Sequence, residues 1–465
     1  MKLNDTIAAI ATPRGSGGIA IIRISGSDSE KIASEMVLPY NNKKIFDLES
    51  HKLTLCRICE GGDPKYIIDE ALVTVMRSPN SYTGETVVEI NCHGGYLAAD
   101  RILRGLLTCG ARLAEAGEFT RRAFINGKTT LCEAEAIIDL MNATSDSGLH
   151  NAAVSLTGRL GEKITAIRES VLALASHVSA AADYPDEVDP PEPGELMQSL
   201  SAIREKIKIL LSGFDTGRIL RDGVRTAIVG RPNVGKSSVL NALLRCDRAI
   251  VTDIPGTTRD TIEEVISVGG IALRLTDTAG IRSSADEVEK IGIEKSKENI
   301  RTADLCLFVI DSSEPITEDD RRIAEAVSKK RTVVLLNKSD KPAAVREDDV
   351  YNELNISPEA ILKTSAPKSG RPFGIEDLET TVSDMFVIGK LNPDEVYLSN
   401  ERQRDSLLKA DAAIERAESE LTCGMPYDLL FIDLEDALSA MGEITGETVQ
   451  QEIVDDVFSR FCVGK

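Results

Sequence analysis

The sequence lacks the features that would place it in a membrane or outside the cell. It has no apolar run long enough to span a bilayer, and residues 1–5 lack the basic-then-apolar layout of a signal peptide. Its nine cysteines are scattered and odd in number, which argues against a disulfide framework. These absences favour a cytoplasmic protein with no membrane contact.

Acidic residues outnumber basic ones, with 75 Asp and Glu against 54 Lys and Arg. The chain has a formal net charge of −21 over 465 residues, which disfavours non-specific binding to nucleic acid. Any contact with RNA therefore needs a local basic patch or a basic surface from a partner. The length is sufficient for roughly two to four domains.

Residues 230–238, Gly-Arg-Pro-Asn-Val-Gly-Lys-Ser-Ser, fit the phosphate-binding pattern G-x-x-x-x-G-K-[ST]. The run 224–229 predicts a buried strand before this loop, and 238–244 predicts a helix after it. Such a turn directs backbone N–H groups and a helix N-terminus at a triphosphate. Lys236 can then reach the β and γ oxygens, and Ser237 can ligate Mg²⁺. The predicted nucleotide contacts are Asn233, Val234, Gly235, Lys236, Ser237 and Ser238.

A second motif, Asp277-Thr278-Ala279-Gly280, follows the apolar run 271–275. Its carboxylate would stand at the end of a strand, where it can hold Mg²⁺ through water. The Gly280 N–H is then free to meet the γ-phosphate. This motif therefore predicts contacts to the metal and to the third phosphate.

A third motif, Asn337-Lys338-Ser339-Asp340, follows the predicted strand 332–336. Asp340 can accept from two parallel N–H donors, a pattern that guanine presents and adenine does not. Lys338 can lie along the base plane, and Ser365-Ala366 can provide a backbone donor to the guanine carbonyl. Together the three motifs predict a GTP-binding domain over residues 219–385.

Residues 1–120 alternate predicted strands with short helices and indicate a compact α+β domain. Strands are expected at 6–10, 18–24, 67–77 and 86–90, and a helix at 97–107. Arg23 and Glu89 place charge on two of these strands, which solvent-facing alternation explains in most proteins. Glu89, however, directly precedes a glycine turn that suits close approach of a ligand. His93 in that turn is a catalytic candidate of low specificity. Cys56 and Cys59 have metal-site spacing, but no second pair follows, so a half-buried strand is favoured.

Helical patterns flank the GTP-binding domain, over residues 121–218 and 386–465. Apolar residues step by three and four, as in a bundle, at Leu160, Ile164, Ile167, Val171, Leu174 and Val178, and again at Leu196, Leu200, Ile203, Ile207 and Leu210. The prolines between 183 and 193 predict either a turn between antiparallel helices or an acidic linker. Further stripes follow at 407–421 and 434–444. Because a lone amphipathic helix is marginal in water, we expect helices from both sides to pack together around an inserted GTP-binding domain.

The glutamine that orients the attacking water in many small GTPases is missing, because Ile281 follows Gly280. Carboxylates at 286–289 offer a substitute. Asn233 has an amide oxygen that can coordinate a monovalent cation near the phosphates, where an arginine otherwise provides charge. A solvated asparagine in a turn explains the same residue equally well.

Several short motifs together resemble the MnmE (TrmE) family of bacterial tRNA-modification GTPases over essentially the full length. They are Ala-Thr-Pro at 11–13, Arg-Ile-Ser-Gly at 23–26, Ser-Tyr-Thr-Gly-Glu at 81–85, Cys-His-Gly-Gly at 92–95, Gly-Glu-Phe at 117–119, Gly-Thr-Thr-Arg-Asp at 256–260 and Phe-Cys-Val-Gly-Lys at 461–465. The valine of the last motif stands where the family has isoleucine. The resemblance implies a folate-binding N-terminal α+β domain, a helical domain and an inserted Ras-like P-loop GTPase domain, assembled as a homodimer.

The resemblance also implies roles for individual residues. The family's folate site corresponds to Arg23, Glu89, Lys128 and Lys465, its potassium ligands to Asn233, Thr252, Ile254 and Thr257, and its Mg²⁺ ligands to Ser237 and Thr258. Its water-orienting acid corresponds to Glu289, and its functional terminal cysteine to Cys462. Further nucleotide contacts are implied at Asp253, Pro255 and Gly256.

The family resemblance implies a reaction and its partners. Together with a flavoprotein, MnmG, such proteins add a (carboxymethyl)aminomethyl group at C5 of the wobble uridine of certain tRNAs. A reduced folate (5-formyl- or 5,10-methylene-tetrahydrofolate) provides a one-carbon unit, GTP is the substrate, and Mg²⁺ and K⁺ are required. The flavoprotein could also present the basic surface that this acidic chain lacks. The alternative is a nucleotide switch for ribosome assembly or signalling, which would not need folate.

Overall fold

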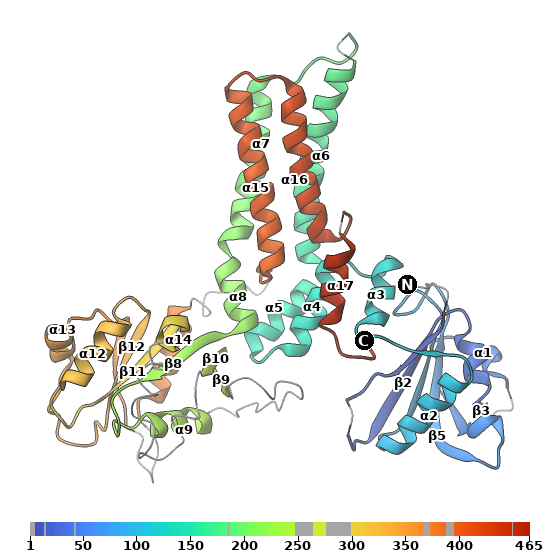
Figure 1. The fold of residues 1–465 in the computed structure, drawn as a ribbon, viewed down its shortest axis with the longest axis horizontal. Helices are drawn as coiled ribbons and strands as arrows, with labels where there is room; N and C mark the ends of the chain where they lie inside the picture. The colour runs from blue at the N-terminus through green and yellow to red at the C-terminus, as the bar shows by residue number, and fades with distance from the viewer. Residues whose placement is uncertain are drawn as a thin grey trace. The chain divides into compact units, whose positions relative to one another are not determined.

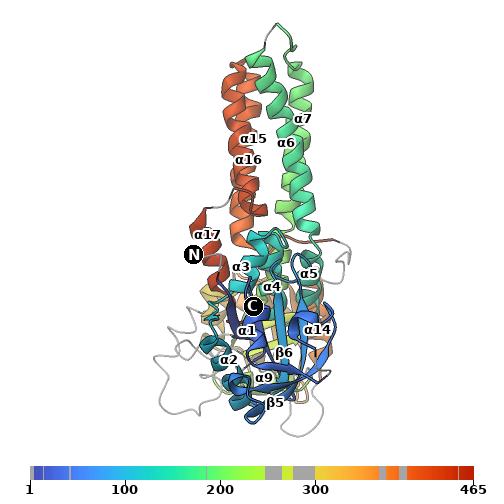
Figure 2. The same ribbon diagram turned by 90° about the vertical axis from the view of Figure 1, so that its right-hand side faces the viewer.

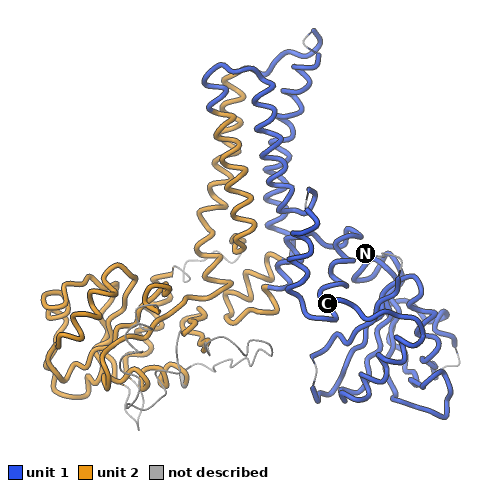
Figure 3. Tube along the Cα trace, viewed as in Figure 1, with its two compact units in different colours: residues 1–138, 156–192, 419–465 blue, residues 139–155, 193–418 orange. Residues whose placement is uncertain are grey.

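The computed structural model describes residues 5–13, 15–40, 43–184, 186–246, 264–275, 299–365, 373–386, 395–448 and 450–465. The chain divides into two compact units (Figure 3). Unit 1 comprises residues 1–138, 156–192 and 419–465, and unit 2 comprises residues 139–155 and 193–418. Each unit is therefore built from segments that are distant in the sequence. None of the described helices is long and apolar enough to cross a membrane.

A sheet of seven described strands forms the N-terminal part of unit 1. Its order is β3-β4-β5-β6-β2-β1-β7, and neighbouring strands are antiparallel except β1 and β7. The bounds are β1 (Ile7–Ile10), β2 (Ile19–Ser25), β3 (Val37–Pro39), β4 (Thr54–Cys59), β5 (Ile67–Met76), β6 (Val87–His93) and β7 (Arg112–Leu113).

Fully buried residues alternate with less buried ones along the central strands, and this alternation distinguishes the two faces of the sheet. Ile22 and Ile24 of β2 and Ile90 of β6 are buried in one core with Ile102 of the covering helix. The intervening residues, Arg23 among them, lie on the opposite face. The remaining elements of this domain are α1 (Ser29–Ser34), α2 (Tyr96–Thr108) and the short 3₁₀ turns η1 (Ile45–Asp47) and η2 (Glu60–Gly62). The predicted α+β class is confirmed.

Cys56 and Cys59 both lie on β4, and both are fully buried. Burial raises the pKa of the Cys56 thiol to about 12 and also raises the pKa of Cys59. Leu55 and Arg57 on the same strand are exposed. The strand is therefore half-buried, as predicted, and the two cysteines are core residues.

Unit 1 also contains helices outside the N-terminal sheet domain. They are α3 (Glu118–Ile125), α4 (Leu131–Asn142, continuing into unit 2), α6 (Arg159–Asp183), α16 (Tyr427–Thr445) and α17 (Gln451–Ser459). α6 and α16 pack along each other (Figures 1 and 2) and bury their apolar stripes, although Leu174 and Leu438 are only half-buried. Arg168 of α6 pairs at 2.8 Å with Glu447, two residues beyond the end of α16. Helix α6 ends at Asp183 and the next helix begins at Pro193, so the predicted proline break is confirmed.

Unit 2 contains a second sheet, whose six described strands have the order β13-β12-β11-β8-β10-β9. All pairs are parallel except β9 and β10. One face packs on α9 and α14 and the other on α12 and α13, which makes the sheet doubly wound. The bounds are β8 (Val224–Val229), α9 (Lys236–Cys246), β9 (Glu264–Val268), β10 (Ile271–Leu275), β11 (Leu305–Asp311), α12 (Glu318–Val327), β12 (Thr332–Asn337), α13 (Glu347–Leu354), β13 (Ala360–Lys363) and α14 (Ile375–Met385). In such folds ligands bind at the carboxyl ends of the strands.

Helices from both sides of this sheet in the sequence pack together within unit 2. Arg204 of α7 (Pro193–Ser212) pairs with Asp411 at 3.1 Å and with Glu418 at 3.0 Å, both on α15 (Glu401–Thr422). The apolar stripes of the two helices are buried, including Leu200, Ile207, Leu407 and Ile414. The expected packing of helices from both sides of the GTP-binding domain is confirmed here.

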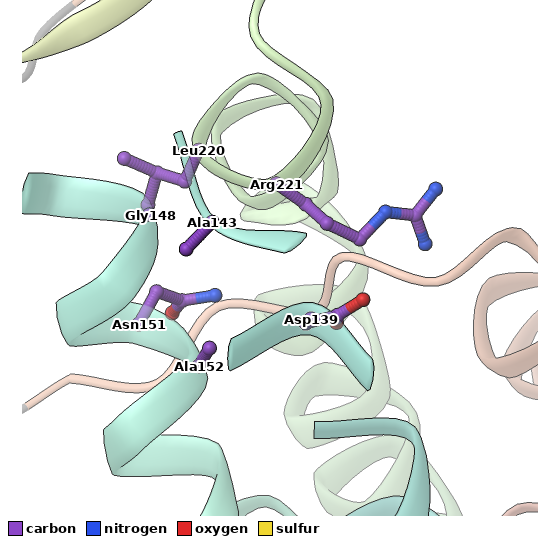
Figure 4. A pocket seen from close by; sticks show the side chains of 7 residues that line it. All are labelled: Asp139, Ala143, Gly148, Asn151, Ala152, Leu220 and Arg221. Carbon is purple, nitrogen blue, oxygen red and sulfur yellow. The ribbon is translucent and has the colours of Figure 1, made fainter. Parts of the chain in front are cut away.

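Two further helices, α5 (Asp146–Leu156) and α8 (Phe214–Asp222), join the helical part of unit 2 to the sheet. The Asn151 side chain accepts from the Tyr397 N–H at 3.1 Å and donates to the Tyr397 carbonyl at 3.4 Å. Asn151 lines a small hollow with Gly148 and Leu220 (Figure 4). An added Cβ at Gly217 of α8 would collide with the Leu398 carbonyl. The chain that enters the sheet and the chain that leaves it are thus held close together, as an inserted domain requires.

Candidate functional site

The predicted phosphate-binding loop connects β8 to α9 at the carboxyl end of a central strand (Figure 1). Gly230 (φ 151°) and Gly235 (φ 102°) have backbone angles that favour glycine, and an added Cβ at Gly235 would collide with the Asn337 amide. The Lys236 ammonium donates to the carbonyls of Gly230 at 2.7 Å and Arg231 at 2.9 Å. Burial lowers the pKa of Lys236. A phosphate is the kind of partner that such a partly desolvated ammonium favours.

The 337–340 loop is joined directly to the phosphate-binding loop. The Asn337 amide donates to the Val234 carbonyl at 2.8 Å, and the Lys338 ammonium donates to the Asn233 carbonyl at 2.9 Å. Lys338 has a left-handed backbone, with φ of 60°. The two loops are therefore held together by side chains of the third motif.

The segment after β13 completes this site. The Ser365 hydroxyl donates to Asp340 Oδ1 at 2.6 Å, and the Ser339 N–H donates to the Thr364 carbonyl at 3.1 Å. The Ser365 hydrogen bond lowers the pKa of the Asp340 carboxyl. An ionised carboxylate accepts hydrogen bonds and donates none, which is the property that recognition of two guanine N–H groups needs.

A second group of predicted residues meets in unit 1, on the face of the N-terminal sheet opposite α2. Arg23 and Glu89 lie directly opposite each other on β2 and β6 and form an ion pair of 2.8 Å. The Arg23 guanidinium lies 5.2 Å from the centre of the Tyr82 ring and 5.6 Å from that of Phe119. These contacts define a polar pair beside two aromatic rings.

The C-terminal segment packs beside this pair. Val463 forms a β-bridge with Ala116, and the Phe119 N–H donates to the Lys465 carbonyl at 3.3 Å. The Gly464 carbonyl accepts from Arg23 at 3.5 Å. Cys462 is exposed. The structure therefore brings Lys465 and the terminal motif to Arg23 and Glu89.

Lys128 and His93 occupy different surroundings. Lys128 lies next to the Ser81–Glu85 loop, because an added Cβ at Gly84 would lie 3.2 Å from the Lys128 Cγ. His93 Nδ1 is 2.7 Å from Asp69 Oδ1, and its side chain is 77% exposed. His93 is thus held by Asp69. It is the last residue of β6, four residues after Glu89.

Comparisons with known proteins agree with this arrangement. A model of the MnmE helical domain matches residues 131–462, and a model of the N-terminus of the GTP-binding protein TrmE matches residues 6–128. The tRNA modification GTPase MnmE of Geobacillus thermodenitrificans is 44% identical over 475 residues, with 99% of each chain covered. The protein of the same name from Geobacter metallireducens is 45% identical over 468 residues, with 100% of each chain covered.

The chain belongs to the MnmE family. This membership confirms the predicted family and the fold class, an N-terminal α+β domain, a helical domain and an inserted Ras-like P-loop GTPase fold. It also identifies the chain as a GTPase of that family.

Several predicted site residues of this MnmE-family chain lie outside the described residues. They are Thr252, Asp253, Ile254, Pro255, Gly256, Thr257, Thr258, Asp277, Thr278, Ala279, Gly280, Glu289 and Ala366, together with Ile281. The described part of the GTP-binding site comprises Asn233 to Ser238, the 337–340 loop and Ser365.

The sequence analysis missed Asp311, the last residue of β11. Its carboxylate is 2% exposed and pairs with the Lys338 ammonium at 2.6 Å. Burial alone would raise the pKa of this carboxyl, but hydrogen bonds from Lys338 and Ser313 outweigh burial and lower it. The available signal in the sequence was its position directly after the apolar run 305–310, whereas its register opposite Asn337 is given only by the structure.

A buried charge cluster next to the Arg23 pair was also missed. Arg122 is 1% exposed and donates to Asp5, Glu85 and Glu118 at distances of 2.6–3.3 Å. Hydrogen bonds from Arg112 and Arg122 lower the pKa of Glu118 despite its burial. This cluster joins the Ser81–Glu85 loop to the Gly-Glu-Phe motif, and so supports two of the motifs that carry the family resemblance.

Proposed function

We propose that this chain binds GTP in the described loops of unit 2 and hydrolyses it to drive modification of tRNA. The observation that carries the proposal is the direct linkage of the phosphate-binding loop to the 337–340 loop through Asn337 and Lys338. In this arrangement Lys236 would neutralise phosphate oxygens. Asp340, oriented by Ser365, would accept the two N–H donors of guanine.

Two cations are part of this proposal. Mg²⁺ would be held by Ser237 and Thr258, and K⁺ by Asn233, Thr252, Ile254 and Thr257. Asn233 fits such a role, because it is exposed in a left-handed turn while Lys338 holds its carbonyl. The cations would stabilise charge that develops on the phosphates. Glu289 would orient the attacking water.

We further propose that a reduced folate binds at Arg23, Glu89, Lys128 and Lys465. Glu89 can accept paired N–H donors of a pterin ring, while the cations can meet its oxygens or the carboxylates of the glutamate tail. The flanking Tyr82 ring, which is 36% exposed, suits a flat heterocycle. When bound, the folate would provide a one-carbon unit, and Cys462 on the adjacent segment would take part in its use.

The proposed reaction adds a (carboxymethyl)aminomethyl group at C5 of the wobble uridine, with the flavoprotein MnmG as partner in the cytoplasm. The proposed domains are 1–120 for folate binding and dimerisation, 121–218 and 386–465 for the helical part, and 219–385 for the GTPase. The curated relatives of this chain are named tRNA modification GTPases, which supports the tRNA substrate.

Two exposed leucines that face each other on neighbouring strands of the N-terminal sheet support the proposed homodimer. Leu55, Leu72, Asn91 and Ile21 form one row across four strands on the face opposite α2. Leu55 is 48% exposed and Leu72 is 43% exposed. Because Arg23 and Glu89 belong to a neighbouring row of this face, association of two copies there would bury the leucines next to the proposed folate site.

Sedimentation velocity tests the dimer. Leu55→Asp with Leu72→Asp should convert the wild-type dimer to a monomer, because two charges would enter the interface. Leu172→Asp, a change at a 45% exposed leucine of α6, is the matched control and should remain dimeric. A dimeric double variant would reject this surface.

The function as a whole is tested by complementation of a bacterial strain that lacks its own family member. Wild type should restore the modified wobble uridine in nucleoside analysis, and Lys236→Ala and Arg23→Ala should not. Calorimetry with 5-formyl-tetrahydrofolate should show binding to wild type and weaker binding to Arg23→Ala. GTP hydrolysis without folate binding and without restored modification would instead support the nucleotide-switch alternative.

A further inference from the structure

Asp311 is a buried carboxylate next to the proposed guanine site. It lies at the end of β11, between the strand that leads into the phosphate-binding loop and the strand that leads into the 337–340 loop. Its Oδ2 accepts from Lys338 at 2.6 Å. Its Oδ1 accepts from the Ser313 N–H at 3.0 Å and from the Ser313 hydroxyl at 2.7 Å. Both oxygens are thus engaged within the protein, and the carboxylate is directed at Lys338.

Lys338 is held at both ends of its side chain. Its backbone is left-handed, with φ of 60°, as is that of Asn233, with φ of 63°. Its ammonium bridges Asp311 and the Asn233 carbonyl. The carbon chain between these ends is the part that would lie along the base. Its path therefore depends on the carboxylate that anchors the ammonium.

We propose that Asp311 is a positioning residue that strengthens purine nucleotide binding by anchoring Lys338 along the base. The inference rests on the proposed GTP site. Asp340 would read the N–H donors of guanine, whereas Lys338 would contact the face of the ring, which every purine offers. Asp311 therefore affects affinity for all purine nucleotides alike and leaves the choice of base to Asp340.

Stopped-flow release of mant-GDP from the full-length protein tests this role. Asp311→Asn keeps an oxygen for Ser313 but presents an amide to Lys338 in place of a negative charge. Release should become roughly 10-fold faster, the scale of one charge-assisted hydrogen bond. Asp304→Asn is the matched control, because Asp304 precedes the same strand and pairs with Arg225 at 3.0 Å. It should release mant-GDP at the wild-type rate.

Two further measurements separate positioning from general destabilisation. The preference for GTP over ITP, which lacks the exocyclic amine, should stay at the wild-type value in Asp311→Asn and collapse in Asp340→Ala. In a Lys338→Met background, Asp311→Asn should produce no additional change in release, because the ammonium that it anchors is gone. This second comparison also serves if the single Asp311 variant does not fold.

The outcomes distinguish the two proposals. Wild-type release from folded Asp311→Asn, a changed GTP-to-ITP preference, or an additive effect in the Lys338→Met background would each overturn the positioning role alone. Failure of the wild-type protein to bind mant-GDP would overturn the GTP site as well.

Discussion

Replacing Gly464 by alanine should displace the C-terminal segment and weaken the proposed folate site. Gly464 has φ of 102°, and a Cβ there would collide with the Ile10 carbonyl and lie 3.0 Å from the Ala11 Cα. Both obstacles are backbone atoms, so no side-chain rotation relieves the contact. The segment itself must move, and Arg23 then loses its hydrogen bond to the Gly464 carbonyl.

The size of the effect follows from these contacts. A left-handed backbone costs a non-glycine residue about 1–2 kcal/mol. Movement of the segment would also break hydrogen bonds to Cys462 at 3.5 Å and to Lys465 at 3.3 Å, each worth roughly 0.5–1.5 kcal/mol net. A docked segment that is destabilised by roughly 2–5 kcal/mol should lower folate affinity by about 30- to 5,000-fold.

Calorimetry with 5-formyl-tetrahydrofolate on the full-length protein measures this change. Gly110→Ala is the matched control, because Gly110 has a similar φ of 113° and an added Cβ would meet nothing within 4 Å. The control carries the same backbone strain without the collision and should bind folate like wild type. Unchanged affinity in Gly464→Ala, or an equal loss in Gly110→Ala, would refute the reasoning.

Asp340→Asn should weaken GTP binding and favour xanthosine triphosphate, because the amide can donate to the added base oxygen; unchanged GTP affinity in a mant-nucleotide titration would contradict this. GTP hydrolysis should be at least about 10-fold faster in KCl than in NaCl, because a cation at Asn233 would stabilise phosphate charge. Equal phosphate release in the two salts would reject the cation. Glu289→Ala should lose hydrolysis and retain nucleotide binding, and hydrolysis at the wild-type rate would exclude a water-orienting role. Cys462→Ser should leave the wobble uridine unmodified, and full modification in nucleoside analysis would show that the cysteine is dispensable.

Local patterns were sufficient to predict the elements that carry both sites. The spacing of Gly230, Gly235 and Lys236 is compatible with few backbone conformations. In the structure the Lys236 ammonium donates back to the carbonyls at the start of the loop. Alternation along β2 placed Arg23 on a face away from the core. Helix stripes at three- and four-residue spacing located the long helices, because burial of one side is a local property of the sequence.

Pairings between distant residues could not be predicted in the same way. Asp311 and Lys338 are separated by an entire helix and strand, and only the adjacency of β11 and β12 brings them together. The bridge between Ala116 and Val463 joins residues that are 347 positions apart in the sequence. No periodic pattern reports such contacts, since they depend on strand order and on the path of the loops.

Three arginines around the proposed folate site are engaged by carboxylates of the protein itself. Arg122 looks like part of a basic segment in the sequence, but it is buried among carboxylates. Its neighbour Arg121 pairs with Asp455 at 2.5 Å, and Arg112 pairs with Asp5 at 2.7 Å. These cations neutralise acids within the protein and position the motifs around the proposed folate site. The net charge of −21 thus fits the proposal that a flavoprotein partner presents much of the surface that attracts the tRNA phosphates.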